Sequence, residues 1–125
     1  MKSGRNFMLN LQSEFEEKLN TAKTNYLKSL NEKHTLLGIL KDLMFKTDDL
    51  KDENLVNAFQ EAYGYIHKLS GSSAMFGFSE LGQTSNKLEL LLKDFIKNDY
   101  SSDKEVICEN FEILLNEIEK AIKKD

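Results

Sequence analysis

The chain has 125 residues, of which 40% are hydrophobic and 30% charged, and its net charge is −4. This length fits one domain with a real core, so we expect residues 1–125 to form a single domain. The acidic balance argues against a nucleic-acid surface, which usually carries a basic patch, and no run approaches the ~20 apolar residues of a membrane span.

The only cysteine, Cys108, bears on the cellular compartment. It cannot form an internal disulfide and has no second cysteine for a zinc site, so a small core or boundary residue on a helix is the simplest interpretation. The N-terminal stretch MKSGRNFMLNLQSEFEEK lacks the apolar core of a signal peptide. Both features predict a reducing cytoplasm.

The spacing of apolar residues at steps of three and four predicts five helices and no strand. The first covers about residues 7–30, with an inward stripe of Met8, Leu11, Phe15, Leu19, Ala22, Tyr26 and Leu30. The second is short, over about residues 35–45, with Leu36, Leu40 and Leu43 inward. In the polar segment KTDDLKDEN that follows, Asp48 or Asp52 suits the N-cap of the next helix.

The third, fourth and fifth helices are expected over about residues 53–76, 80–97 and 104–123. Their inward stripes are Leu55, Phe59, Ala62, Ile66, Leu69 and Ser73, then Leu81, Leu88, Leu92 and Phe95, then Ile107, Phe111, Leu114, Ile118 and Ala121. Gly77 is expected to end the third helix and Ser79 to cap the fourth.

Short connections between amphipathic helices predict antiparallel neighbours. We therefore expect an all-α, up-down four-helix bundle, with the additional short helix near the N-terminal half lying across one end. Because the stripes account for the apolar residues without a large exposed patch, we also expect a monomer.

One histidine stands away from this core. At about 100° per residue, His67 lies roughly 120° from the stripe on its own helix, so we expect it at the surface. The strip of helix around it holds Gln60, Tyr63, Gly64, Ser70, Gly71 and Ala74. The two glycines remove side chains that would flank the imidazole, which favours a flat patch that another protein can approach closely. The alternative is a surface histidine beside glycines that serve helix packing.

No metal site is predicted around either histidine. A bundle metal site would use Glu-x-x-His pairs, and no Glu lies three residues before His34 or His67. His34, at an expected helix start, is interpreted as solvent-exposed. Met75 and Leu90 are either docking contacts or singly exposed apolar residues.

The stretch HKLSGSSAMFGFSELGQTSNKLE, residues 67–89, resembles the signature of histidine-containing phosphotransfer (HPt) domains. That signature is His-x-Leu-Lys-Gly-Ser-Ser/Ala, a Gly five or six residues on, and a helix ending in Leu-Glu or Leu-Gln. The matching residues are His67, Leu69, Gly71, Ser72, Ser73, Gly77, Leu81, Leu88 and Glu89. One position departs, since Ser70 stands where the family commonly has Lys. Lys68 could supply the missing positive charge, or it could be a solvated lysine.

The resemblance implies a relay in which His67 carries a phosphoryl group between aspartates of receiver domains. The implied partners are a response-regulator receiver domain, a hybrid histidine kinase, or both. Mg²⁺ is then expected on the receiver and no cofactor on this chain. The sequence has no Gly-rich nucleotide loop, so we expect no autokinase activity.

Glu89 is the residue expected to orient the imidazole, because the family often has a hydrogen-bonding residue at this position. It could accept from Nδ1–H and leave Nε2 as the nucleophile. The alternative is a surface pair of Glu89 with Lys93, one turn on.

Two other functions fit the sequence. One is a non-catalytic helical-bundle interaction domain, which docks a receiver-like partner without phosphotransfer. The other is a plain structural bundle. Incubation with a phosphorylated receiver separates the relay from both.

Overall fold

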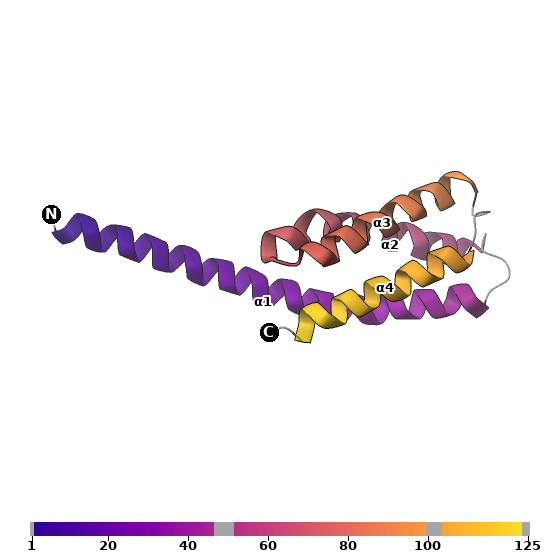
Figure 1. Cartoon of the computed structure of the whole chain (residues 1–125), viewed down its shortest axis with the longest axis horizontal. Coiled ribbons are helices and arrows are strands. Elements are labelled where there is room, and N and C mark those ends of the chain that lie inside the picture. Colours follow the sequence, from indigo (N-terminus) through magenta and orange to yellow (C-terminus); the bar gives the residue numbers. More distant parts are fainter. Residues whose placement is uncertain (1, 47–51, 100–103, 124–125) are drawn as a thin grey trace.

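Four α-helices make up the computed structural model, which describes residues 2–46, 52–99 and 104–123. They are α1 (Lys2–Lys46), α2 (Glu53–Ser72), α3 (Ser79–Lys97) and α4 (Lys104–Lys123), with a 3-10 helix, η1 (Ser73–Phe76), directly after α2. Figure 1 shows α2, α3, α4 and the C-terminal half of α1 side by side, each running opposite to the one before it. The expected all-α, up-down bundle is confirmed.

The N-terminal region differs from the expected pair of helices. α1 continues without interruption through residues 31–34, so the prediction of an additional short helix over residues 35–45 is wrong. The polar run Asn31–His34 contains neither Pro nor Gly, so nothing in it stops a helix. Leu30, Leu37 and Met44 continue one buried face through this region.

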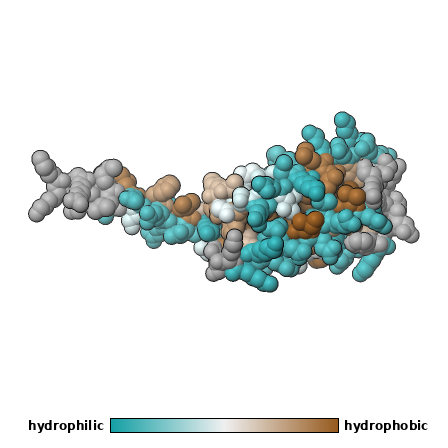
Figure 2. All heavy atoms as spheres, in the orientation of Figure 1, coloured by the Kyte–Doolittle hydropathy of each residue, from teal (hydrophilic) through white to brown (hydrophobic). Residues whose placement is uncertain are grey.

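The continuity of α1 also changes which residues face the core. Leu37, Leu40 and Met44 are buried, whereas Leu36 and Leu43, which we expected inside, are exposed. The expected inward stripe of the first helix is exposed at Leu11, Phe15, Leu19 and Ala22 as well. This part of α1 projects past the bundle and carries apolar atoms on its surface (Figures 1 and 2). The premise of the monomer prediction, that no large apolar patch is exposed, is therefore wrong.

The other three stripes pack as expected. All their residues are buried: Leu55, Phe59, Ala62, Ile66, Leu69 and Ser73; Leu81, Leu88, Leu92 and Phe95; Ile107, Phe111, Leu114, Ile118 and Ala121. The rings of Phe59 and Phe95 meet edge to face, with centroids 5.3 Å apart. Cys108 is buried among them, and burial raises the pKa of its thiol, as befits a core residue.

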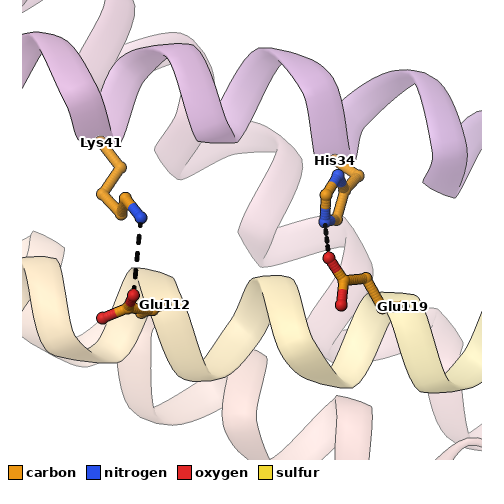
Figure 3. A network of polar contacts seen from close by, with 4 residues as sticks. All are labelled: His34, Lys41, Glu112 and Glu119. Atoms are coloured by element: carbon orange, nitrogen blue, oxygen red, sulfur yellow. Dashed lines mark hydrogen bonds and ion pairs between the residues drawn. The ribbon is translucent and has the colours of Figure 1, made fainter.

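Two polar pairs join α1 to α4 along the outside of the core (Figure 3). His34 Nε2 lies 3.0 Å from Glu119 Oε1, and Lys41 Nζ lies 3.8 Å from Glu112 Oε1. His34 is therefore a partly covered partner of α4 and not the free surface residue that we expected. Partly exposed pairs of this kind contribute about 0.2–1 kcal/mol each to the free energy of unfolding. They are therefore evidence for the antiparallel register of α1 and α4, but a small part of what stabilises it.

The ends of α2 follow from local chemistry. Asp52 caps its start, where Oδ1 accepts hydrogen bonds from the backbone N–H groups of Asn54 and Leu55 at 3.1 and 3.3 Å. Asp48, the other candidate cap, lies outside the described residues. Gly77 ends η1 with a φ of 86°, a left-handed conformation that favours glycine. The residue before α3 is Phe78, so the expected cap at Ser79 is one position late.

Tyr26 closes the bundle at this end. Its hydroxyl lies 2.8 Å from Ser73 Oγ, and its ring stacks on Phe76 with centroids 4.6 Å apart. Ser73 Oγ in turn donates to the Leu69 carbonyl at 2.6 Å. α1 thus leaves the bundle just before Tyr26, at the level of η1.

We predict that Gly77→Ala lowers the free energy of unfolding by about 1–2 kcal/mol, because alanine is strained at a left-handed φ. Gly71→Ala is the matched control, since Gly71 is helical and an added Cβ meets no atom within 4 Å. It should leave stability level or raise it by up to about 1 kcal/mol. Urea unfolding followed by circular dichroism measures both. Equal stability of the two variants would contradict the assigned turn.

Candidate functional site

His67 lies on the surface of α2, with 67% of its side-chain surface exposed. Its neighbours on α2, Ile66 and Leu69, pack inward and are fully or almost fully buried. The helical period thus puts the core on one side of α2 and the imidazole on another. The ring is held on a rigid element and is open to another protein.

Glu89 on α3 holds one side of the ring. His67 Nδ1 lies 2.6 Å from Glu89 Oε1, and the Glu89 side chain is only 14% exposed. An ionised carboxylate can only accept, so this contact favours the tautomer in which Nδ1 carries the proton and Nε2 keeps its lone pair. The described ion pairs join Glu89 to His67 and not to Lys93, which was the alternative partner.

Gly82, which we did not single out, lies where α3 packs directly against the end of α2 and η1. It is buried, and a Cβ built on it would lie 3.5 Å from Ser73 Cβ and 3.7 Å from the Ser70 carbonyl oxygen. Ser85, one turn further on and also buried, is small as well. Small residues at Gly82 and Ser85, two turns and one turn before Glu89, were the available sequence signal.

The surface around His67 is low and mixed in character. The ring of Tyr63 lies nearly parallel to the imidazole, with centroids 6.4 Å apart. Gly64 and Gly71 are both exposed, and a Cβ on either would meet no atom within 4 Å. Neither glycine therefore packs against another helix of this chain, as the helix-packing alternative required.

The remaining candidates surround this patch at different depths. Gln60 and Ala74 are exposed, although Ala74 belongs to η1 and not to α2. Lys68 is exposed and Ser70 is half-buried. Among the described residues, no lysine or arginine forms a hydrogen bond or ion pair with His67 or Glu89. Within the described ranges, no helix is long and apolar enough to cross a membrane.

His67 is thus an exposed imidazole on a helical bundle, with one ring nitrogen in contact with a carboxylate. A family model, the Hpt domain, matches residues 11–123. The chain therefore belongs to the Hpt domain family, and membership implies a role in phosphorelay histidine phosphotransfer and interaction with receiver domains. Comparison with curated proteins finds no match, and comparison with solved structures finds none.

We predict that Glu89 decides which ring nitrogen of His67 carries the proton. At a pH where the ring is neutral, the parent should show the Nδ1–H tautomer in long-range ¹H–¹⁵N spectra. Glu89→Ala should shift the population toward Nε2–H, since the acceptor at Nδ1 is lost. Lys93→Ala, an exposed neighbour on the same helix, is the control and should change nothing. An unchanged tautomer in Glu89→Ala would show that the contact does not orient the ring.

Proposed function

We propose that His67 accepts a phosphoryl group from the aspartyl phosphate of a receiver domain and passes it to the aspartate of another receiver. The observation that carries this proposal is the exposed imidazole with Nδ1 2.6 Å from the Glu89 carboxylate. It leaves Nε2, the nitrogen remote from Glu89, as the nucleophile.

The transfer is balanced without any further reactant. The Nε2 lone pair attacks phosphorus, the bond from phosphorus to the aspartate oxygen breaks, and its electron pair stays on the leaving carboxylate. The phosphorylated ring keeps its Nδ1 proton and carries positive charge, which the Glu89 carboxylate stabilises. The same steps in reverse, with a second aspartate, complete the relay. Such a transfer depends mainly on alignment and charge neutralisation.

The docking surface of this proposal is the patch around the ring, formed by Gln60, Tyr63, Gly64, Gly71 and Ala74. Its two glycines let the rim of a receiver pocket approach the imidazole without meeting a side chain. Exposed apolar residues nearby in the chain, Met75 and Leu90, are candidate contacts for the rim of the receiver.

Charge compensation is divided between the two proteins in this proposal. Ser70 cannot supply a cation, so Lys68, which is exposed on the next face of α2, or a lysine of the partner does so. Mg²⁺ is expected in the acidic pocket of the receiver, and the domain needs no cofactor or ATP of its own. A buried, unpaired Cys108 suits a reducing cytoplasm.

We predict that the parent takes up phosphate from a phosphorylated receiver and that His67→Gln abolishes this uptake. The exposed position of His67 means that the fold should survive the change, which circular dichroism checks. His34→Gln is the control histidine and should transfer at the parental rate. ATP alone should label neither protein.

The outcomes separate the candidate functions. Labelling that persists in His67→Gln would place the acceptor elsewhere and overturn the proposal. A parent that binds the receiver but takes up no phosphate would instead be a binding-only domain.

The clearance over Gly71 gives a second test. Gly71→Gln should fold at least as well as the parent, because glutamine is the better helix former, and should transfer at least about tenfold more slowly, because misplacement of ~1 Å is costly. Gly38→Gln is the matched control on α1, since a Cβ there also meets nothing within 4 Å. Transfer at the parental rate in Gly71→Gln would show that this glycine does not clear a docking surface.

A further inference from the structure

The strongest feature outside the histidine site is a pair of exposed apolar stripes on α1. One lies on the part of the helix that projects past the bundle, and the other lies beside α2. The first comprises Leu11, Phe15 and Leu19, which are 46%, 67% and 44% exposed, and the second comprises Leu36, Ile39 and Leu43, which are 55%, 53% and 46% exposed.

The second stripe borders an apolar hollow between α1 and α2. The hollow measures about 230 Å³ and is lined on the α2 side by Ala58, Glu61, Ala62 and Tyr65. The small side chains of Ala58 and Ala62 leave room for an apolar side chain from outside. A helix laid along α1 at this point would fill the hollow.

Five of these six residues, all except Leu19, belong to one heptad seam. Steps of four and three residues lead along α1 through positions 11, 15, 18, 22, 25, 29, 32, 36, 39 and 43, which is the spacing of a coiled coil. Every position of the seam is exposed except Ser29, which is half-buried beside α2. The seam is apolar at its two ends. Its middle is charged, polar or small, at Lys18, Ala22, Asn25, Ser29 and Glu32.

We propose that the chain forms an antiparallel dimer through α1, with the two-fold axis crossing the seam at the level of residue 27, between Asn25 and Ser29. Leu11 and Leu43 lie equally far from Leu27 along the helix, and so do Phe15 and Ile39. A second copy placed antiparallel about this point therefore lays Leu11 and Phe15 of each copy on Leu43 and Ile39 of the other, beside the hollow. The apolar ends of the seam in one copy cover the apolar ends in the other. The two four-helix bundles then lie at opposite ends of the dimer.

The charged residues of the seam favour this direction over a parallel pair. In a parallel dimer Lys18 would face Lys18 and Glu32 would face Glu32, and like charges in a seam are destabilising. In the antiparallel register Lys18 lies over Leu36 and about one turn, or ~6 Å, from Glu32 of the other copy. Glu14 then comes near Asp42, but both are at the solvent edge, where such contacts cost little.

The exposed apolar area suits a stable dimer. The five apolar residues of the seam are 46–67% exposed in one copy, and a second helix laid on the seam covers all five. Polar flanks add to this, and a standard interface buries about 800 Å² per partner. A helix draws most of its stability from packing, and residues 10–22 are all exposed in one copy.

This surface is separate from the histidine patch. Tyr65, on the hollow, and His67 differ by about 200° around α2. A second helix in the hollow therefore leaves the imidazole and Glu89 open to a receiver. The dimer neither needs nor excludes phosphotransfer, so the two proposals fail independently.

The test is the mass of the intact chain in solution, measured by sedimentation at about 5–100 μM. We expect a dimer for the parent and a monomer for Phe15→Glu, which lies outside the bundle and should leave the four-helix bundle folded, as circular dichroism checks. Ile113→Glu on α4, an apolar residue that is 47% exposed and lies off the seam, is the control and should remain a dimer. A monomeric parent at 100 μM would overturn the proposal.

Cross-linking tests the direction. Thr21 and Thr35 are exposed and flank the seam at positions that meet across the axis. A mixture of Thr21→Cys and Thr35→Cys should give a mixed dimer with a short bismaleimide, whereas Thr21→Cys alone should not, since its two copies lie ~20 Å apart. The parent, whose Cys108 is buried, gives the background. Self-linked Thr21→Cys would overturn the antiparallel register, and phosphotransfer lost in Phe15→Glu would show that the stripe binds the receiver instead.

Discussion

The close packing of α3 on α2 is the constraint on which the histidine site depends. Gly82 lies against Ser73 and the Ser70 backbone, and the next two turns of α3 carry Glu89 to within 2.6 Å of His67 Nδ1. N–H···O hydrogen bonds in proteins have donor–acceptor distances of about 2.7–3.2 Å, so this contact tolerates little outward movement of α3. A side chain larger than alanine at Gly82 would move α3 outward, and the ring would lose its acceptor while the core stayed largely intact.

The same helix supports the core and the site on different faces. Phe59, Ile66 and Leu69 anchor α2 in the core, and burial of each such side chain contributes about 1.5–3 kcal/mol. Gly64 and Gly71 cost about 0.8–1 kcal/mol each as helix-interior glycines. The core therefore offsets the glycines, and the surface around His67 can stay bare without loss of the fold.

The sequence predicted α2, α3 and α4 well because each has one apolar stripe and short connections, so period and phase determine what is buried. It failed on α1 for two physical reasons. A polar run such as residues 31–34 continues a helix as readily as it forms a turn. An apolar stripe shows which face of a helix is hydrophobic, but it does not show which other surface covers that face. The helical wheel permitted a contact between Glu89 and His67. The distance of that contact depends on how closely α3 packs against α2 near Gly82, and the residue pattern of a single helix does not determine how closely two helices pack.

α1 carries two apolar seams, and this explains why the prediction of its buried residues from the sequence was wrong. Leu30, Leu37 and Met44 repeat at steps of seven and face the bundle, while Leu36 and Leu43, one position earlier, repeat at the same steps and face outward. A single helix with one apolar face would need only the first set. The second set is costly to expose and has no partner in the bundle, whereas the site at His67 uses only α2 and α3. Selection for phosphotransfer alone gives no reason to keep large apolar residues at Phe15 and Ile39, and a second copy on α1 does.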